Sequence, residues 1–427
     1  MKRTKHIVFF LLFSLFMMEG QGQKLKINLD ETGETYIKGS LRGQFWVRYY
    51  DTNPGTTING EPTSSVTDFS IRRIRANISA QLTPKIFVYA LVGENNTNSK
   101  TEKDFTLDFL DFYAEYQFNK AISIGMGKSS WEGLSRWNVR SSKSLMALDA
   151  PLFSLLTVNK NDDLGRGIGA WIKGQIGKFD YIVSVKDPVA YGVEPTEGKV
   201  DFALNKTKKR TSAYLKYEFW DDESNKTAYS GGTGTYLGKK KLLNLGVGFM
   251  VQPDMTSQLV NGVEKYYDFK NWAVDAFLEL PLNNRESSIT SYLGFYSTDF
   301  GPNYIRNLGV NDIADSQGTS FNGGGNDFPM MGTGKTVFIQ CGYLLPKFKK
   351  LSHRIQPNIA VQYSDFDVLD DPMITYDLGI NYYLNGHNNK LTLGYQDRPI
   401  FNENNLGEIK KTSRRGMLVL QYQIEIN

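Results

Sequence analysis

Apolar and polar residues alternate along most of this chain. Between residues 36 and 50, Leu41 and Phe45 fall on one set of alternate positions, whereas Arg42 and Gln44 fall on the other. Successive side chains of a β-strand point to opposite faces of a sheet, while one face of a helix repeats every three or four residues. This segment is therefore predicted to be a strand with one apolar face and one polar face.

The same alternation recurs up to the C-terminus. Aromatic residues make up 13% of the chain and glycines number 40, a mixture that favours strands and irregular loops over helices. The predicted strands are sixteen, at roughly residues 36–50, 69–82, 85–93, 106–118, 121–128, 166–176, 179–187, 211–220, 242–251, 269–280, 287–299, 335–345, 354–364, 373–384, 390–399 and 415–427.

Short turns and long loops alternate between these strands, as at the turn 177–178 and the loop 129–165. Two connections break the rule, because 365–372 is short for a loop and 221–241 is long for a turn. Backbone groups in lipid must be paired within the protein, which only helices and closed barrels achieve. The pattern predicts an all-β protein, a transmembrane up-and-down antiparallel barrel with short periplasmic turns and long extracellular loops.

The N-terminus indicates export. Basic residues in the first five positions precede an apolar run at residues 7–18, which is the layout of a secretory signal peptide. No later stretch approaches the ~20 apolar residues of a membrane helix. We predict a signal peptide at residues 1–22 and a single barrel domain at residues 23–427, located in the outer membrane of a Gram-negative bacterium. A barrel of sixteen strands encloses an aqueous lumen.

Several classes of function are disfavoured. The full chain has 49 basic and 45 acidic residues, and removal of the predicted signal peptide leaves 46 and 44, a net charge of +2 that argues against nucleic acid as a partner. Cys341 is the only cysteine, so an intramolecular disulfide is excluded. Beyond the predicted signal peptide the histidines are His353 and His387, both in predicted periplasmic turns, so a Ser–His pair at the outer rim is not available. We therefore expect no enzymatic activity, no metal site and no cofactor.

Short motifs resemble those of the phosphate-selective porins O and P. The paired arginines at residues 69–75 resemble an early strand of that family. Residues 107–116 followed by 125–128 resemble its passage into the third loop, and residues 164–169 followed by 179–181 resemble the strands after it. The resemblance implies a sixteen-stranded barrel, a third loop folded inward as the constriction, and a homotrimer.

The chain departs from the pattern of that family in two places. Ser129, Ser130 and Trp131 stand where the family usually has proline with an aromatic residue. The chain also ends at Asn427 without a terminal aromatic residue.

Basic residues concentrate on the predicted inward faces and in the third loop. A guanidinium group holds phosphate or carboxylate through two hydrogen bonds while it stays charged, so a basic wall would attract anions. Arg72 falls on the lipid-facing parity, where we expect either a side chain that extends toward the membrane interface or an ambiguity in the strand register, and no anion site. The predicted pore-lining residues that attract anions are Lys38, Arg42, Arg48, Arg73, Arg75, Lys128, Arg136, Arg140, Lys143, Arg398 and Arg415.

Together these features predict an outer-membrane porin, a water-filled channel for passive diffusion of small anionic solutes, with phosphate as one candidate. The predicted partners are outer-membrane lipid, small anions and two further copies of the chain. Asp111, Glu115 and Asp275 are also predicted to face the lumen, which is equally compatible with a general porin without anion preference. The sequence as a whole also leaves three alternatives open. These are a non-conducting barrel that acts as a scaffold or adhesin, a barrel enzyme, and a soluble β-sandwich.

Overall fold

A computed structural model describes residues 25–139, 141–161, 165–189, 192–204, 206–230, 234–347 and 353–427. The predicted signal peptide at residues 1–22 lies outside these ranges.

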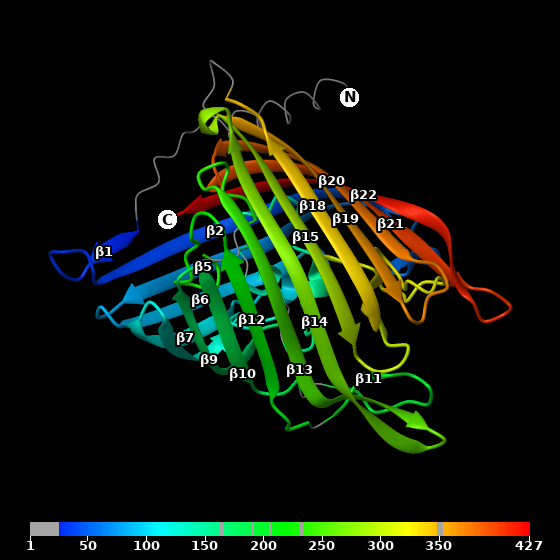
Figure 1. The fold of residues 1–427 in the computed structure, drawn as a ribbon. Helices are drawn as coiled ribbons and strands as arrows, with labels where there is room; N and C mark the ends of the chain where they lie inside the picture. Colours follow the sequence, from blue (N-terminus) through cyan, green and yellow to red (C-terminus); the bar gives the residue numbers. More distant parts are fainter. Residues whose placement is uncertain are drawn as a thin grey trace, which may run out of the picture.

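Sixteen long strands form one closed antiparallel barrel (Figure 1). Each strand pairs with the next along the chain, and the last pairs with the first, with Arg42 opposite Glu425. The predicted number of strands and their antiparallel order are confirmed. The strands are β2 Tyr36–Asp51, β5 Ser65–Gln81, β6 Ile86–Thr97, β7 Asp108–Asn119, β8 Ile122–Ser129, β9 Gly167–Ile176, β10 Phe179–Lys186, β12 Arg210–Glu218, β13 Leu242–Val260, β14 Val263–Leu282, β15 Ser287–Asp299, β18 Gly334–Leu344, β19 Arg354–Phe366, β20 Met373–Asn385, β21 Asn389–Glu403 and β22 Ile409–Ile426.

The remaining elements are short. None of the helices in the described residues is long and apolar enough to cross a membrane. The short strands are β1 Lys26–Asn28, β3 Thr57–Ile58, β4 Glu61–Pro62, β11 Asp201–Phe202, β16 Ile305–Leu308 and β17 Phe328–Gly332, and the 3₁₀ turns are η1 Glu102–Asp104, η2 Arg136–Val139, η3 Leu152–Ser154 and η4 Asn283–Arg285.

The two ends of the barrel differ. At one end the connections are mostly tight, such as the turn between β9 and β10, where Gly177 has a φ of +60° that a two-residue hairpin favours. We call this the short-turn end, and β1 and the C-terminus lie there (Figure 1). At the opposite, long-loop end, two hairpins are longer than predicted. β13 and β14 stay paired out to Val260 and Val263, and β21 and β22 out to Glu403 and Ile409.

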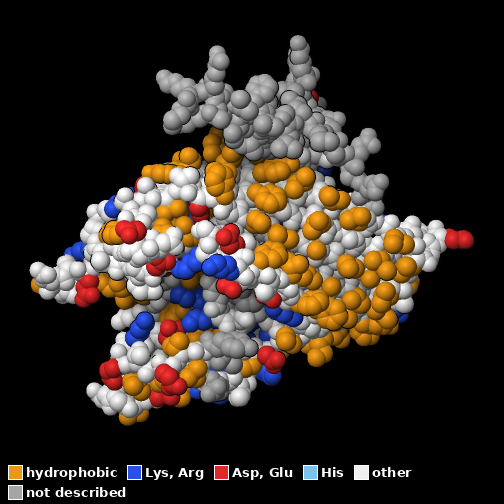
Figure 2. Space-filling model, turned by 180° about the vertical axis from the view of Figure 1, so that it is seen from behind, with side chains coloured by type: hydrophobic (Ala, Val, Ile, Leu, Met, Phe, Trp, Pro, Cys, Tyr) orange, Lys and Arg blue, Asp and Glu red, His pale blue; other side chains and the backbone are white. Residues whose placement is uncertain are grey.

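Apolar side chains cover the outer surface of the wall. Leu41, Leu293, Ile339 and Leu378 are each about half exposed and point away from the lumen. Figure 2 shows this wide hydrophobic surface on one side of the barrel. A soluble monomer rarely exposes a contiguous apolar patch larger than a few hundred Å². An apolar belt around a closed barrel is what contact with lipid requires.

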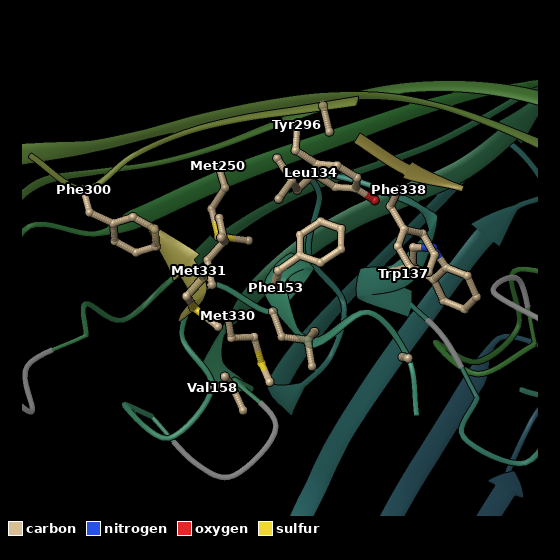
Figure 3. Close-up of a cluster of buried hydrophobic side chains, with 14 of the residues drawn as sticks. Leu134, Trp137, Phe153, Val158, Met250, Tyr296, Phe300, Met330, Met331 and Phe338 are labelled. Atoms are coloured by element: carbon tan, nitrogen blue, oxygen red, sulfur yellow. The ribbon is translucent and has the colours of Figure 1, made fainter. Parts of the chain in front are cut away.

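The interior is partly filled by a hydrophobic core. The third loop (residues 130–166) folds into the barrel and packs against β14, β15 and β18. The ring of Phe153 lies with its centroid 5.0 Å from that of Tyr296 and 5.7 Å from that of Phe338, and Trp137 lies 5.1 Å from Tyr292 (Figure 3). The inward third loop is therefore held on one side of the lumen, and the opposite wall of β2, β5 and β6 stays polar.

An arginine placed on the outer belt tests this assignment. Leu41, the sixth of the sixteen residues of β2, lies opposite Ala76 of β5 and Ile426 of β22. Arginine on the lipid face near the midplane costs about 2–4 kcal/mol. We therefore expect Leu41→Arg to lower the yield of refolding into lipid vesicles, measured by heat-modifiable gel mobility. Ser79→Arg, at a partly buried position that borders the lumen, should refold like the wild type. Equal refolding of both variants would show that the two faces are assigned incorrectly.

Candidate functional site

A cavity of about 430 Å³ lies between the polar wall of β2, β5 and β6 and the inward third loop. Its lining contains hydroxyl groups from both sides, among them Ser40 of β2 and Ser142 of the third loop. Glu425 of β22 contributes a carboxylate. The cationic side chains that line it are Lys38, Arg42, Arg73, Arg75, Lys143 and Arg166. We call this volume the basic cavity. Five of its six cations belong to the predicted set, and the sixth, Arg166, does not.

The pairing of β2 with β5 brings the arginines together. Arg42 lies directly opposite Arg75, and Gln44 lies opposite Arg73. Residues opposite each other in an antiparallel pair have Cβ atoms about 5 Å apart, so like charges there repel. The arrangement therefore needs compensating groups, and the third loop supplies some of them.

A β-bulge in β5 determines the orientation of Arg72. The register of β2 against β5 shifts after Gln44, so that β5 contains one extra residue at this point. Arg72 is buried, and its Nη2 donates to the Asp149 carboxylate at 2.9 Å. A β-bulge places two successive side chains on one side of a strand, so the expected extension of Arg72 toward the membrane interface is wrong and the alternative, an ambiguity in the register, is confirmed.

Asp149 of the third loop is the acid between two of these arginines. It accepts hydrogen bonds from both Arg72 and Arg73. Burial alone would raise the pKa of Asp149, but the adjacent guanidinium groups of Arg72 and Arg73 outweigh burial and lower it. Arg73 uses another N–H to donate to Gln44 at 2.8 Å. The charge of this part of the cluster is thus partly neutralised by the loop.

The positive charges of Arg75 and Arg42 are balanced less by nearby carboxylates than those of Arg72 and Arg73. Arg75 donates to the carbonyl oxygens of Ile74 at 2.7 Å and Glu94 at 2.8 Å, and to the Asn95 amide. No ion pair found among the described residues joins Arg75 to a carboxylate. Arg42 donates to Ser142 at 2.9 Å, and its Nη1 lies 3.7 Å from Glu425. Arg42 thus shares the single carboxylate of Glu425 with Lys143, and positive charge exceeds negative charge at the Arg42–Arg75 pair.

Two other lining cations have close partners. Lys143 of the third loop forms a 2.7 Å ion pair with Glu425 on β22. Arg166, at the end of the third loop, pairs with Asp111 at 3.1 Å and donates to the Tyr229 hydroxyl. Lys38 is exposed at the short-turn side of the cavity. Pattern analysis missed Arg166 and Tyr229, although Arg166 stands in the motif at residues 164–169 that resembles the porin family.

A second inward segment begins at the short-turn end. Residues 219–241, the long exception among the turns, connect β12 to β13, and we call them the turn-side segment. Its Glu223 binds Arg136 of the third loop through two hydrogen bonds of 2.6 and 2.7 Å. Arg136 also lies over the Phe277 ring, 3.6 Å from the centroid, and Glu223 lies 3.1 Å from Lys216. Arg136 is therefore buried in an ion pair, and its predicted place on the lining of the passage is wrong.

Three more predicted residues lie at the long-loop end and fix loops. Arg48 pairs with Asp68 at 2.6 Å and donates to carbonyl groups of the loop 300–333. Arg398 donates to the Asp51 carbonyl at 2.6 Å, and Arg415 donates to a carbonyl of the first loop. These three do not line the basic cavity, because their guanidinium groups are used to hold loop backbone.

The last two predicted residues are Lys128 and Arg140. Lys128 lies opposite Phe112 and Ile168, whose side chains are exposed on the outer surface. Opposite residues share a face, so Lys128 points outward and its predicted inward position is wrong. Arg140 lies outside the described residues.

Metal-binding groups are sparse in the part of the chain that the structure describes. No three side chains of His, Cys, Asp or Glu lie close enough together there to hold a metal ion. His353 shares a 2.7 Å hydrogen bond with Tyr382, and His387 lies 2.9 Å from the Thr235 carbonyl oxygen.

Comparison with known proteins adds information on the fold. No protein-family model and no curated protein sequence matches this chain. The high-pH structure of Pseudomonas putida OprB aligns with a TM-score of 0.54 at 9% identity, over 92% of this chain and 95% of that chain. The anion-selective porin from Comamonas acidovorans aligns with a TM-score of 0.48 at 11% identity, over 92% of this chain and 99% of that one. Salmonella typhi OmpF, in complex with daunomycin, aligns with a TM-score of 0.49 at 11% identity, over 92% and 98%. The likeness to OprB is one of fold and agrees with the closed barrel.

Removing the charge of Glu223 tests the ion pair between the two inward segments. Breaking a buried pair leaves its partner charged and costs about 3–5 kcal/mol. We expect Glu223→Gln to lower the temperature at which the barrel unfolds, as followed by gel mobility. The matched control is Asp222→Asn, because Asp222 is 41% exposed in its pairs with Lys120 and Lys178. Exposed pairs are worth about 0–1 kcal/mol, so equal effects of the two variants would contradict the assignment.

The ion pair between Glu223 and Arg136 also predicts how the stability of the barrel depends on pH. Burial alone would raise the pKa of Glu223, but Arg136 and Lys216 outweigh it and lower the pKa from 4.5 to about 2. An acid whose pKa is lower in the folded state stabilises the fold above its unfolded pKa, and this contribution disappears as pH falls through the folded value. The stability difference between wild type and Glu223→Gln should be constant from pH 8 to 5 and shrink below pH 4.5. A difference that shrinks near neutral pH would contradict the pairing.

Proposed function

We propose that the protein is an outer-membrane porin, a non-enzymatic channel for passive diffusion that prefers small anions. The observation that carries this proposal is the Arg42–Arg75 pair in the basic cavity, where positive charge exceeds the carboxylates within reach. The apolar belt supports a location in lipid. The short turns lie at the same end of the barrel as β1 and the C-terminus, which supports a periplasmic position for that end.

A basic cavity with low-dielectric walls would favour anions over cations. Field lines concentrate in a narrow passage between protein walls, which raises the local concentration of ions of opposite sign. A channel also needs each ion to leave, so binding at any one point must stay weak. Partial compensation by Asp149 and Glu425 limits the strength of the cluster in the way that transport requires.

The basic lining continues toward the short-turn end. A second cavity of about 730 Å³ lies there and shares Lys143 with the basic cavity. The other cations that line it are Lys239, Arg285, Lys347 and Arg354. Adjacent basic volumes offer an anion successive weak sites, and this supports a route past Lys143 to the periplasmic mouth.

The finer parts of the proposal rest on the sequence motifs. The resemblance to phosphate-selective porins supports phosphate as one solute and a homotrimer as the assembly. The paired guanidinium groups of Arg42 and Arg75 suit phosphate and carboxylate equally well, because both offer two acceptor oxygens.

A non-conducting barrel is the second candidate. The hydrophobic core between the third loop and β14, β15 and β18 resembles the interior of a soluble protein, and the turn-side segment fills further space. Such packing would suit a barrel that displays its long loops as a scaffold or adhesin. Conductance across planar bilayers distinguishes the two candidates, because a barrel with a blocked lumen gives no current steps.

Charge reversal tests the anion preference. In a KCl gradient, we expect the wild-type reversal potential to favour chloride. Arg42→Glu with Arg75→Glu should move it toward the value for potassium, because the passage would then carry net negative charge. The matched control, Lys103→Glu in η1 with Lys265→Glu on the β13–β14 hairpin, makes the same charge change at exposed positions and should leave selectivity unchanged. A wild-type channel that prefers cations would refute the proposal, and unchanged selectivity in the Arg42, Arg75 variant would place the filter elsewhere.

A further inference from the structure

Part of the turn-side segment closes one side of the basic cavity. Residues 223–230 reach into the barrel from the short-turn end, whereas the third loop enters from the long-loop end. Thr227, Tyr229 and Ser230 line the cavity together with Ser142 and Lys143 of the third loop. The space beside Arg42 and Arg75 is thus bounded by two segments that enter from opposite ends of the barrel.

This segment is held firmly along its length. Lys173 of β9 donates to the Asn225 carbonyl at 2.6 Å, and Gln175 donates to the Glu223 carbonyl at 2.7 Å. The Glu223 side chain is bound to Arg136, and Ala228 is fully buried. These contacts with β9, with the third loop and with buried residues indicate that the segment is an ordered part of the lumen wall and differs from a solvent-exposed turn.

Tyr229 is the largest side chain that the segment adds to the cavity. Its hydroxyl donates to Asp111 of β7, accepts from Arg166 at 3.1 Å, and lies 3.1 Å from the hydroxyl of Ser130. Its ring lies 5.8 Å from the ring of Tyr89 on β6, measured between centroids. Contacts at the hydroxyl and at the ring hold this side chain in one orientation beside the arginine cluster.

We propose that residues 223–230 form a second constriction of the passage and that Tyr229 determines the size of the anions it admits. This inference rests on the proposed function, since it assigns the size limit of the same basic cavity. Arg42 and Arg75 attract the anion by charge, whereas the fixed ring of Tyr229 limits the width available beside them. Size and charge selection would then reside on different elements, the ring on the turn-side segment and the charges on β2 and β5.

Substitutions that change the size of the ring test this inference. Tyr229→Ala should raise single-channel conductance in KCl and admit gluconate in addition to acetate, while the preference for anions persists. Tyr229→Trp should lower conductance below that of the wild type. Tyr229→Phe keeps the ring and should retain wild-type conductance, which separates width from the loss of the hydroxyl. The control is Tyr266→Ala, on the exposed β13–β14 hairpin, which should change nothing.

The outcomes separate this inference from the proposed function. A wild-type channel that prefers anions, with equal conductance in Tyr229→Ala and Tyr229→Trp, would overturn the inference alone. A cation-preferring wild type whose conductance still follows ring size would overturn only the anion preference. If the wild type shows no conductance but Tyr229→Ala conducts, the constriction is supported and an open wild-type channel is refuted. If neither conducts although both give the heat-modifiable mobility of a folded barrel, both proposals are wrong.

Discussion

Closure of the barrel between β2 and β22 is the constraint on which the rest of the structure depends. A strand edge in lipid would leave its N–H and C=O groups without partners, at a cost of several kcal/mol for each group. Pairing of Arg42 with Glu425 and of Tyr50 with Met417 removes that edge. The same seam creates part of the candidate site, because Glu425 reaches both Arg42 and Lys143 only when the ends of the chain meet.

The lumen is divided between two kinds of interior. On the side of β14, β15 and β18, aromatic wall residues pack with the third loop, as in the core of a soluble protein. On the side of β2, β5 and β6, arginines and hydroxyl groups line the basic cavity. A loop fixed to one wall by burial of apolar surface can hold Asp149 and Lys143 in place near the other, so the core positions the polar site.

The buried ion pair of Arg136 and Glu223 illustrates the cost of this arrangement. Taking two charges out of water is unfavourable unless their remaining hydrogen-bonding groups are also satisfied. Lys216, Asn244 and Tyr236 supply further contacts to Glu223. The pair joins a loop from one end of the barrel to a segment from the other, and its directional hydrogen bonds specify how the two segments meet.

The sequence by itself determined the strands, their faces and the side of the barrel that is basic. These follow from local rules, since alternate side chains of a strand point to opposite faces and consecutive strands pair. The inward parity of Arg42, Arg73 and Arg75 therefore could be predicted without knowledge of any distant contact. The tertiary structure decided which charges remain available. The bulge that turns Arg72 inward, the pairing of Arg136 with Glu223 and the use of Arg48 to hold a loop all depend on partners that alternation does not encode. Whether a buried cation attracts a solute depends on its nearest carboxylate, and in this barrel that carboxylate belongs to another segment, far away in the sequence.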